Sequence, residues 1–490
     1  MGERVLKRLS IALAAVLGLG SVAGSATGGG TSVITAAAGK GVLLRAPHRP
    51  AQSTSWPNAS PRPRRAPLAG PAFVPGFIVV KFEPTLTAQA VERVARAIGA
   101  RGITRPSYAD FVYVELPREA DPAAAAAALA GQPGVVYAEP DAVRHPTYRP
   151  NDPLYSHQWN FQRLDMERAW DINPGARSDV VVAVLDTGVA FLDEGAFAQA
   201  PDLRGTRFVP GYDFIWDDAE PVDFDGHGTH VSGTIAQTTG NGEGVAGIAF
   251  SASLMPVKVL FTYWDEQFGA PDPYGASAVA RGIRFAAENG AKVINMSLGG
   301  VLPSTPEEDA MRYAVERGVF IAIAAGNHAV SCDDCPPGIG PNPVEYPAKY
   351  AEDLEGAMAV AALDYNLERA FYANVQSYVE IGAPGGDVGV DLSGDGFGDG
   401  VLQQTLDPAY VEAGLFDRFS YEFFEGTSMA TPHVAGFAAL LISQGVTSPA
   451  AVEAAIKRFA TDTAPAGRDP FTGYGALNPP ATLQGLGIAR

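Results

Sequence analysis

The 490-residue sequence predicts an α/β fold whose main body is a doubly covered, mainly parallel β-sheet. Beyond residue 150, strongly apolar runs alternate with segments of helical spacing, and strands that are apolar along their length are buried on both faces. The runs are residues 180–185, 257–260, 292–298 and 319–325, with helices expected near 276–290 and 306–317. Ligands of such sheets bind beyond the carboxyl ends of the strands, so functional residues are expected just after the runs.

A small two-layer α/β domain is predicted to precede this sheet, over residues 73–145. Its strands are expected at 77–82, 111–116 and 135–137, and its helices at 87–100 and from 121 onward. Asp121 followed by Pro122 is a typical helix start, because aspartate caps the first turn and proline fits its first position. A domain this small buries little surface alone, so we expect it to fold against the rest of its own chain.

Charge divides the chain into three parts. Residues 1–72 carry a net charge of +8, residues 73–145 carry −1, and residues 146–490 carry −26. Hydrophobic residues make up 47% of the chain and charged residues only 18%, which excludes intrinsic disorder. Nucleic acid is not expected as a partner, because phosphate binding requires a basic face. Two cysteines exclude a disulfide-based scaffold.

The N-terminus reads as an export signal over residues 1–26. Arg4, Lys7 and Arg8 precede an apolar segment from Leu9 to Gly20, and small residues follow where a signal peptidase could cut. The alternative is an uncleaved anchor helix. Residues 27–72 are rich in proline, arginine and serine, which is typical of a linker. The composition favours cleavage, so we expect a secreted protein with no stable membrane partner.

Four polar motifs follow strands or precede helices in the large domain. They are Asp186-Thr187-Gly188, His227-Gly228-Thr229-His230, Ala324-Ala325-Gly326-Asn327 and Gly426-Thr427-Ser428. Serine is a weak nucleophile that requires an adjacent base, and histidine titrates in the range that suits this base. A carboxylate orients the imidazole, and an amide stabilises an oxyanion. Together these residues indicate acyl-transfer chemistry.

In their order and spacing, these motifs resemble those of the subtilisin-type serine proteases. The resemblance covers a peptidase domain at 146–490, and residues 73–145 are similar to the family's inhibitory propeptides. It implies that Asp186 orients the histidine, His227 is the general base, Ser428 is the nucleophile and Asn327 is the oxyanion donor. His230 is then expected to be a packed helix residue. The protein is expected to be a serine endopeptidase; the alternatives are a catalytically silent relative and a calcium-dependent binding protein.

The resemblance also implies substrate-binding segments and partners. Ser297, Leu298, Gly299 and Gly300 resemble the segment that pairs with an extended substrate, and Ala324, Ala325 and Gly326 resemble a pocket wall. The expected partners are protein or peptide substrates and the chain's own propeptide, acting as an intramolecular inhibitor that is cut within 144–151. A monomer is expected. Residues 371–374 depart from the family's usual Phe-Ser-Asn-like segment.

Cys332 and Cys335 are expected to form a short local disulfide in a secreted chain. The alternatives are free thiols and a zinc site that recruits His328, although the zinc site lacks a clear fourth ligand.

Structural calcium is expected, and no cofactor for catalysis. Asp391, Ser393, Asp395 and Asp399 have the spacing of a calcium loop with Gly396 at its sixth position, although the closing glutamate is replaced by Leu402. A solvated acidic turn is the alternative. By resemblance, Asp202 and Asn241 belong to a second site, with Gln158 as a weak further ligand. The segment 212–218 also resembles an acidic segment of thermitase-like members.

Overall fold

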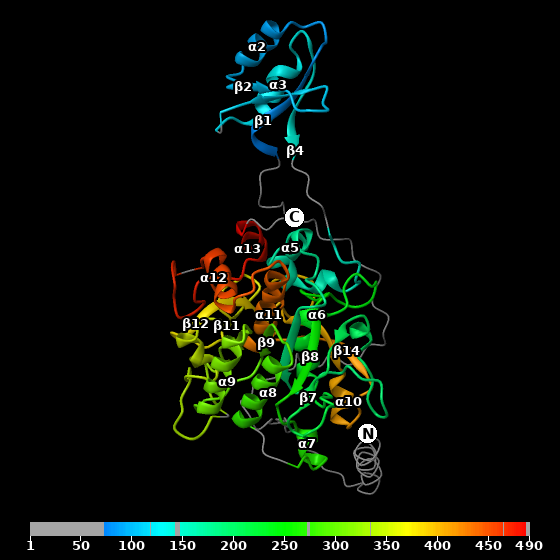
Figure 1. Ribbon diagram of the computed structural model, residues 1–490, viewed down its shortest axis with the longest axis vertical. Coiled ribbons are helices and arrows are strands. Elements are labelled where there is room, and N and C mark those ends of the chain that lie inside the picture. Colours follow the sequence, from blue (N-terminus) through cyan, green and yellow to red (C-terminus); the bar gives the residue numbers. More distant parts are fainter. Residues whose placement is uncertain are drawn as a thin grey trace. The chain divides into compact units, whose positions relative to one another are not determined.

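The computed structural model describes residues 73–117, 119–142, 148–271, 275–333, 335–463 and 465–486. The expected signal and linker therefore lie outside the described residues, as does the first half of the expected cleavage region, residues 144–147. The chain divides into two compact units near residue 147. Each is described by itself, and Figure 1 draws the helices and strands of both.

The smaller unit is a four-stranded antiparallel sheet with two helices. Its elements are β1 (Phe73–Phe82), α2 (Ala88–Arg96), β2 (Gly102–Thr104), β3 (Val112–Glu115), α3 (Pro122–Ala130) and β4 (Val135–Ala142). The sheet order is β2-β3-β1-β4, and Ile78, Val114 and Leu129 are fully buried in its core. The expected β-α-β-α-β order lacks β2. This strand has only three residues and no buried side chain, so it carries no apolar pattern in the sequence.

The larger unit is built on an eight-stranded sheet in which every strand pair is parallel. Its strands are β5 (Val181–Asp186), β6 (Arg207–Phe208), β7 (Tyr212–Asp213), β8 (Ser253–Lys258), β9 (Val293–Met296), β10 (Phe320–Ala324), β11 (Ala357–Leu363) and β12 (Val379–Pro384). The strand predicted at 257–260 begins earlier, at Ser253. The first half of this strand was not predicted, because the polar Ser253 and Pro256 interrupt the apolar run.

Helices cover both faces of this sheet, as predicted. Val182 and Val184 of β5 pack in the cluster of α6 (His227–Ala236) and α11 (Thr427–Ser443). Ala183 and Leu185 point to the opposite face, into the cluster of α8 (Ala276–Glu288) and α9 (Thr305–Glu316). Figure 1 shows α8 and α9 side by side. This alternation of buried residues explains why the strands read as continuous apolar runs.

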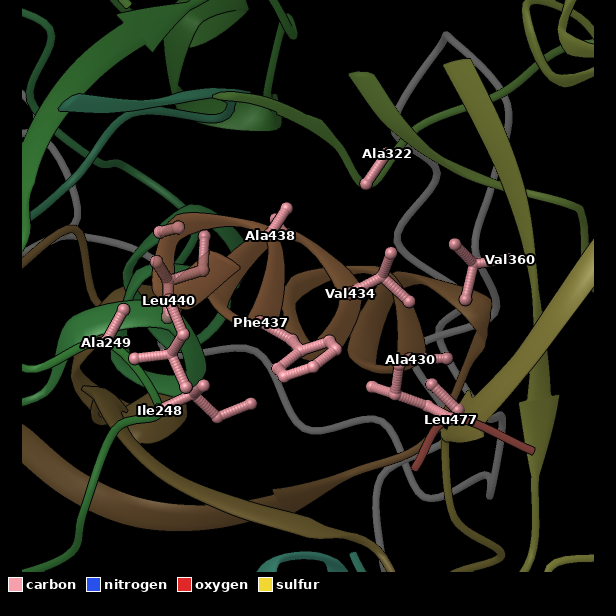
Figure 2. Packing of buried hydrophobic residues seen from close by; sticks show 14 of the residues in the cluster. Ile248, Ala249, Ala322, Val360, Ala430, Val434, Phe437, Ala438, Leu440 and Leu477 are labelled. Atoms are coloured by element: carbon pink, nitrogen blue, oxygen red, sulfur yellow. The ribbon is translucent and has the colours of Figure 1, made fainter. Parts of the chain in front are cut away.

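Helix α11 is the most deeply buried helix of the larger unit, with only Ile442 of its 17 residues partly exposed. Figure 2 shows Val434 pointing toward the strand residues Ala322 and Val360, while Leu440 points toward Ile248 on the other side. The helix therefore has no polar face, which is the pattern of a helix inside a core rather than on a surface.

Short elements complete the larger unit around this frame. They are η2 (Tyr155–His157), α4 (Trp159–Arg163), α5 (Met166–Ile172), η3 (Pro201–Leu203), α7 (Tyr263–Gln267), η4 (Ala348–Asp353), the hairpin β13 (Val401–Leu406) and β14 (Phe419–Phe424), α10 (Pro408–Glu412), α12 (Pro449–Phe459) and α13 (Pro479–Gly485). Across the described ranges, none of the helices combines the length and the apolar character that crossing a membrane requires.

Replacing a large side chain of α11 should destabilise the larger unit. Phe437 is fully buried, so Phe437→Ala is expected to lower the free energy of unfolding by about 3–5 kcal/mol, through lost contacts and an unfilled cavity. Phe371 is 48% exposed, and Phe371→Ala is the matched control, expected to change stability by less than about 1 kcal/mol. Denaturant titrations measure both values, and equal effects would contradict the assigned burial.

Candidate active site

Asp186 and His227 meet at the carboxyl end of β5. Asp186 is the last residue of that strand and is fully buried, whereas His227 is the first residue of α6. His227 Nδ1 lies 2.7 Å from Asp186 Oδ1, which also accepts a hydrogen bond from the backbone of Thr187 at 2.8 Å. The carboxylate thereby fixes the imidazole ring and the nitrogen that carries its proton.

Asp223, which the sequence reasoning did not single out, ties the two elements together. Its Oδ1 accepts hydrogen bonds from the Thr187 hydroxyl at 2.9 Å and from the backbone of Gly226 at 3.0 Å. Its Oδ2 accepts from the backbone and hydroxyl of Thr229. These bonds satisfy free N–H groups at the start of α6 and hold the helix against the end of β5. The recognisable signal is an aspartate just before a helix start.

Acidic neighbours change the acidity of His227. Burial alone would lower the pKa of the imidazole, but the nearby carboxylates of Asp186, Asp225 and Asp223 outweigh it and raise that pKa above its ordinary value. The cationic form of His227 is therefore favoured by its surroundings, as required of a group that receives a proton during a reaction.

Ser428 lies in the first turn of α11 and exchanges hydrogen bonds with Ser297. The Ser428 hydroxyl donates to the carbonyl oxygen of Ser297 at 3.2 Å, and the Ser297 hydroxyl donates to the carbonyl oxygen of Ser428 at 2.7 Å. Asn295 of β9 donates to the Ser297 hydroxyl at 3.0 Å. The start of α11 is thus fixed to the end of β9.

The amide of Asn327 is oriented by Thr427. The backbone N–H and the hydroxyl of Thr427 both donate to Asn327 Oδ1 at 2.8 Å, so the Nδ2 group remains available as a donor. A β-carbon built on Gly426 would lie 3.4 Å from Asn327 Nδ2 and 3.6 Å from the backbone nitrogen of Ser428. The two donors therefore flank one small space at the positive end of a helix, an arrangement suited to an anion. Thr427 was not predicted to have this role.

The two predicted substrate-binding segments lie at the ends of neighbouring strands. Gly300 exchanges backbone hydrogen bonds with Tyr346 at 2.8 and 2.7 Å. Within the described part of the chain, the backbone groups of Leu298 and Gly299 have no hydrogen-bond partner. Ala324 is the last residue of β10, and after it the backbone N–H of Ala325 donates to Val360 and that of Gly326 donates to the Thr427 hydroxyl. The free backbone of 298–299 is thus open to an added strand.

Comparison with known proteins decides the family of this site. The profile of the subtilase family matches residues 177–475, which is more than half of the chain, and residues 59–141 match the fervidolysin N-terminal prodomain. The chain belongs to the subtilase family. It is a subtilisin-like serine protease that carries an N-terminal propeptide domain.

Individual subtilases show the same likeness. The chain is 32% identical to a thermophilic serine proteinase of Bacillus sp. strain AK1, across 76% of this chain and 79% of that protein. It is 36% identical to thermitase of Thermoactinomyces vulgaris, across 64% and 92%. Among solved structures, fervidolysin of Fervidobacterium pennivorans, a keratinolytic enzyme related to subtilisin, matches with 25% identity and a TM-score of 0.54, across 84% of this chain and 61% of that one.

His230 and the two cysteines of this subtilase were also singled out from the sequence. His230 is fully buried on α6, stacks on Phe424 and contacts the carbonyl oxygens of Val401 and Glu422 through Nε2. Cys332 and Cys335 form a disulfide, so they are not zinc ligands. His328, the third residue of the zinc alternative, lies 2.7 Å from Glu345 through Nδ1.

Asp202 and Asn241 lie together, beside an aspartate that was not predicted. Asn241 Nδ2 donates to Asp202 Oδ1 at 2.8 Å. Burial raises the pKa of Asp202 to about 7, and the Asp152 carboxylate also raises it. Within the described ranges, neither aspartate forms an ion pair with a lysine or arginine. Two buried carboxylates suit Ca²⁺, while Asn241 turns its Nδ2 toward Asp202 and its Oδ1 accepts from the backbone of Glu243 at 2.8 Å. Gln158 does not join them, because its amide bonds to the backbone of Ala246 and Leu402.

The predicted loop ligands at 391–399 are each engaged with the loop itself or with a neighbour. Asp391 accepts from the backbone of Gly394 and Gly396, and Asp399 accepts from the backbone of Leu392 and Ser393. Asp395 Oδ2 lies 2.8 Å from His157 Nδ1. In the described part of the chain, no group of three or more His, Cys, Asp or Glu side chains is placed to hold a metal. A calcium ion in this loop stays a prediction.

Removing the charge of Asp186 should lower the pKa of His227. Asp186→Asn leaves the imidazole buried but takes away the closest negative charge, so this pKa is expected to fall by about one unit or more. NMR titration of ¹⁵N-labelled histidine, in protein that also carries Ser428→Ala to prevent self-cleavage, measures it. Asp179→Asn is the control, since Asp179 is exposed. An unchanged His227 pKa in Asp186→Asn would contradict the assigned pairing.

Proposed function

We propose that the protein is a secreted serine endopeptidase in which Asp186, His227 and Ser428 form the catalytic triad and Asn327 supplies an oxyanion donor. The observation that carries the proposal is the placement of these groups at one edge of the sheet. Asp186 holds His227 at 2.7 Å, and Ser428 lies in the first turn of α11, next to Thr427, which orients the amide of Asn327. Export is proposed from the N-terminal sequence, and a relative from Xanthomonas campestris is an extracellular protease.

The reaction follows from what each group can donate or accept. The Ser428 hydroxyl turns from Ser297 toward His227, gives up its proton to Nε2, and its oxygen bonds to the carbonyl carbon of the substrate. The carbonyl oxygen becomes an oxyanion that accepts from Asn327 Nδ2 and from the backbone N–H of Ser428. His227 passes the proton to the leaving amine as the peptide bond breaks, which leaves an ester on Ser428. Water then hydrolyses that acyl-enzyme by the same steps.

Substrate positioning is assigned to the two strand-end segments. The free backbone of Leu298 and Gly299 pairs with an extended peptide, which fixes the scissile bond without reading side chains. Ala324, Ala325 and Gly326 form one wall of the pocket for the residue before that bond. The unit at 73–145 is proposed to inhibit the enzyme until the chain is cut within 144–151, and the mature enzyme is proposed to act as a monomer.

Calcium is proposed to bind at Asp152, Asp202 and Asn241. Bound there, a cation would supply the positive charge that two neighbouring buried carboxylates lack. Asp202 lies in η3, and its Oδ2 accepts from the backbone of Val245 in the segment after α6, so the ion would strengthen the link between these segments.

Chelation should therefore destabilise the folded protein. A ligand at 1,000 times its dissociation constant stabilises the folded state by about 4 kcal/mol, so EDTA is expected to lower the melting temperature by several degrees. Asp202→Asn should largely remove the difference between calcium and EDTA, while the exposed Asp179→Asn should keep it. Calorimetry of Ser428→Ala protein measures these shifts. A full calcium effect in Asp202→Asn would exclude this site.

Replacing the nucleophile should abolish both maturation and proteolysis. The full chain carrying Ser428→Ala is expected to remain uncut and to hydrolyse casein at least about 10⁴-fold more slowly than the wild type. Ser448 is an exposed serine on the same unit, and Ser448→Ala is the control, which should mature and cut normally. Gel analysis and a casein assay measure the outcome. An active, self-processed Ser428→Ala protein would refute the proposed triad.

A further inference from the structure

A buried carboxylate lies between the two predicted substrate-binding segments. Glu345 is in the loop between β10 and η4, and the residue is 3% exposed. A β-carbon built on Gly299 would lie 2.9 Å from Glu345 Oε2, and one built on Gly326 would collide with Oε1. Because both residues are glycines, the Glu345 carboxylate can lie against both segments. These two segments are the ones proposed to form the pocket for the residue before the scissile bond.

One oxygen of this carboxylate is firmly held. Glu345 Oε1 lies 2.7 Å from His328 Nδ1 and accepts from Asn374 Nδ2 at 2.8 Å. Asn374 is itself fixed, since its Oδ1 accepts from the backbone of His328 at 2.7 Å and its N–H donates to Gly326. These contacts set the direction of the carboxylate relative to the wall at Gly326.

The other oxygen has no such partner. Within the described part of the chain, Glu345 Oε2 accepts no hydrogen bond, and the ion pair of Glu345 is with His328 rather than with a lysine or arginine. A neutral imidazole can donate through Nδ1 and leave the charge of the carboxylate in place. Glu345 Oε2 is not among the fully buried oxygens that lack a partner, so it keeps a small contact with solvent, and a ligand that brings a donor can reach it.

We propose, on the basis of the proposed function, that Glu345 forms the floor of this pocket and selects substrates with lysine or arginine before the scissile bond. The ammonium or guanidinium group would donate to Oε2, while the aliphatic stem packs between residues 297–300 and 324–326. An apolar side chain would fill the same space and leave Oε2 unpaired, and an acidic one would add repulsion.

Glu345 is a specificity residue in this account, because it touches the substrate side chain but not the reacting atoms. Its loss should change the ratio of kcat/KM between peptides rather than acyl transfer in general. Peptides that differ only at the residue before the scissile bond, carrying Lys, Arg, Leu, Phe or Glu, measure this ratio in the enzyme matured from the full chain. Titration of Ser428 with a phosphonate gives the active concentration.

The wild-type enzyme is expected to cleave the Lys and Arg peptides at least about tenfold better than the Leu and Phe peptides. Glu345→Gln keeps the shape and the acceptor for His328 but removes the charge. It should lower kcat/KM for the basic peptides about 10- to 100-fold and change the others by less than about threefold. Glu355→Gln makes the same chemical change at an exposed position and should leave all ratios unchanged.

A measurement on the wild type alone covers the case in which Glu345→Gln does not fold. Benzamidine, an aromatic cation, should inhibit competitively, and the neutral benzamide should not. A wild type that prefers Leu or Phe, or a basic preference that Glu345→Gln leaves intact, would overturn this inference while Ser428 is still labelled. If Ser428 is not labelled and no peptide is cut, the proposed function fails, and this inference fails with it.

Discussion

The burial of α11 is the constraint on which the larger unit depends. A 17-residue helix without a polar face can exist in water only if other elements enclose it, and here α6 and the central parallel strands do so. Enclosure fixes where the helix begins. Its first turn must then find partners for free backbone N–H groups, and Asn327, at the end of β10, accepts from Thr427.

The same requirement explains why polar groups gather at the carboxyl edge of the sheet. The strands there end in a buried setting, so many of the polar side chains that follow them bond to one another. Asp223 receives donors from Thr187 and from the start of α6, and Ser297 bonds to Ser428. Bonds that satisfy a folded core thereby also hold His227 against Asp186 and the first turn of α11 against Ser297 and Asn327.

The sequence predicted the parallel sheet and its covering helices better than the hydrogen bonds that join distant segments. Apolar runs and their spacing predicted a parallel sheet with helices on both faces, because those patterns depend on local burial. Asp186, His227 and Asn327 could be singled out from the sequence because each lies in a short recognisable motif, and their catalytic roles stay predictions. Asp223, Thr427 and Glu345 were not assigned roles, because their partners come from segments that fold together only in three dimensions. Strand β2 was missed because three partly buried or exposed residues carry no periodic signal.

A crystal structure of the mature enzyme with a peptide boronic acid would test the central claim most directly, namely that the sheet edge assembles one catalytic centre. The account predicts a covalent bond from the boron to Ser428 Oγ. One boronate oxygen should lie within hydrogen-bond distance of Asn327 Nδ2 and the backbone nitrogen of Ser428, and the other should lie near His227 Nε2. An inhibitor bound elsewhere, or an adduct whose oxygens contact neither Asn327 nor His227, would contradict it.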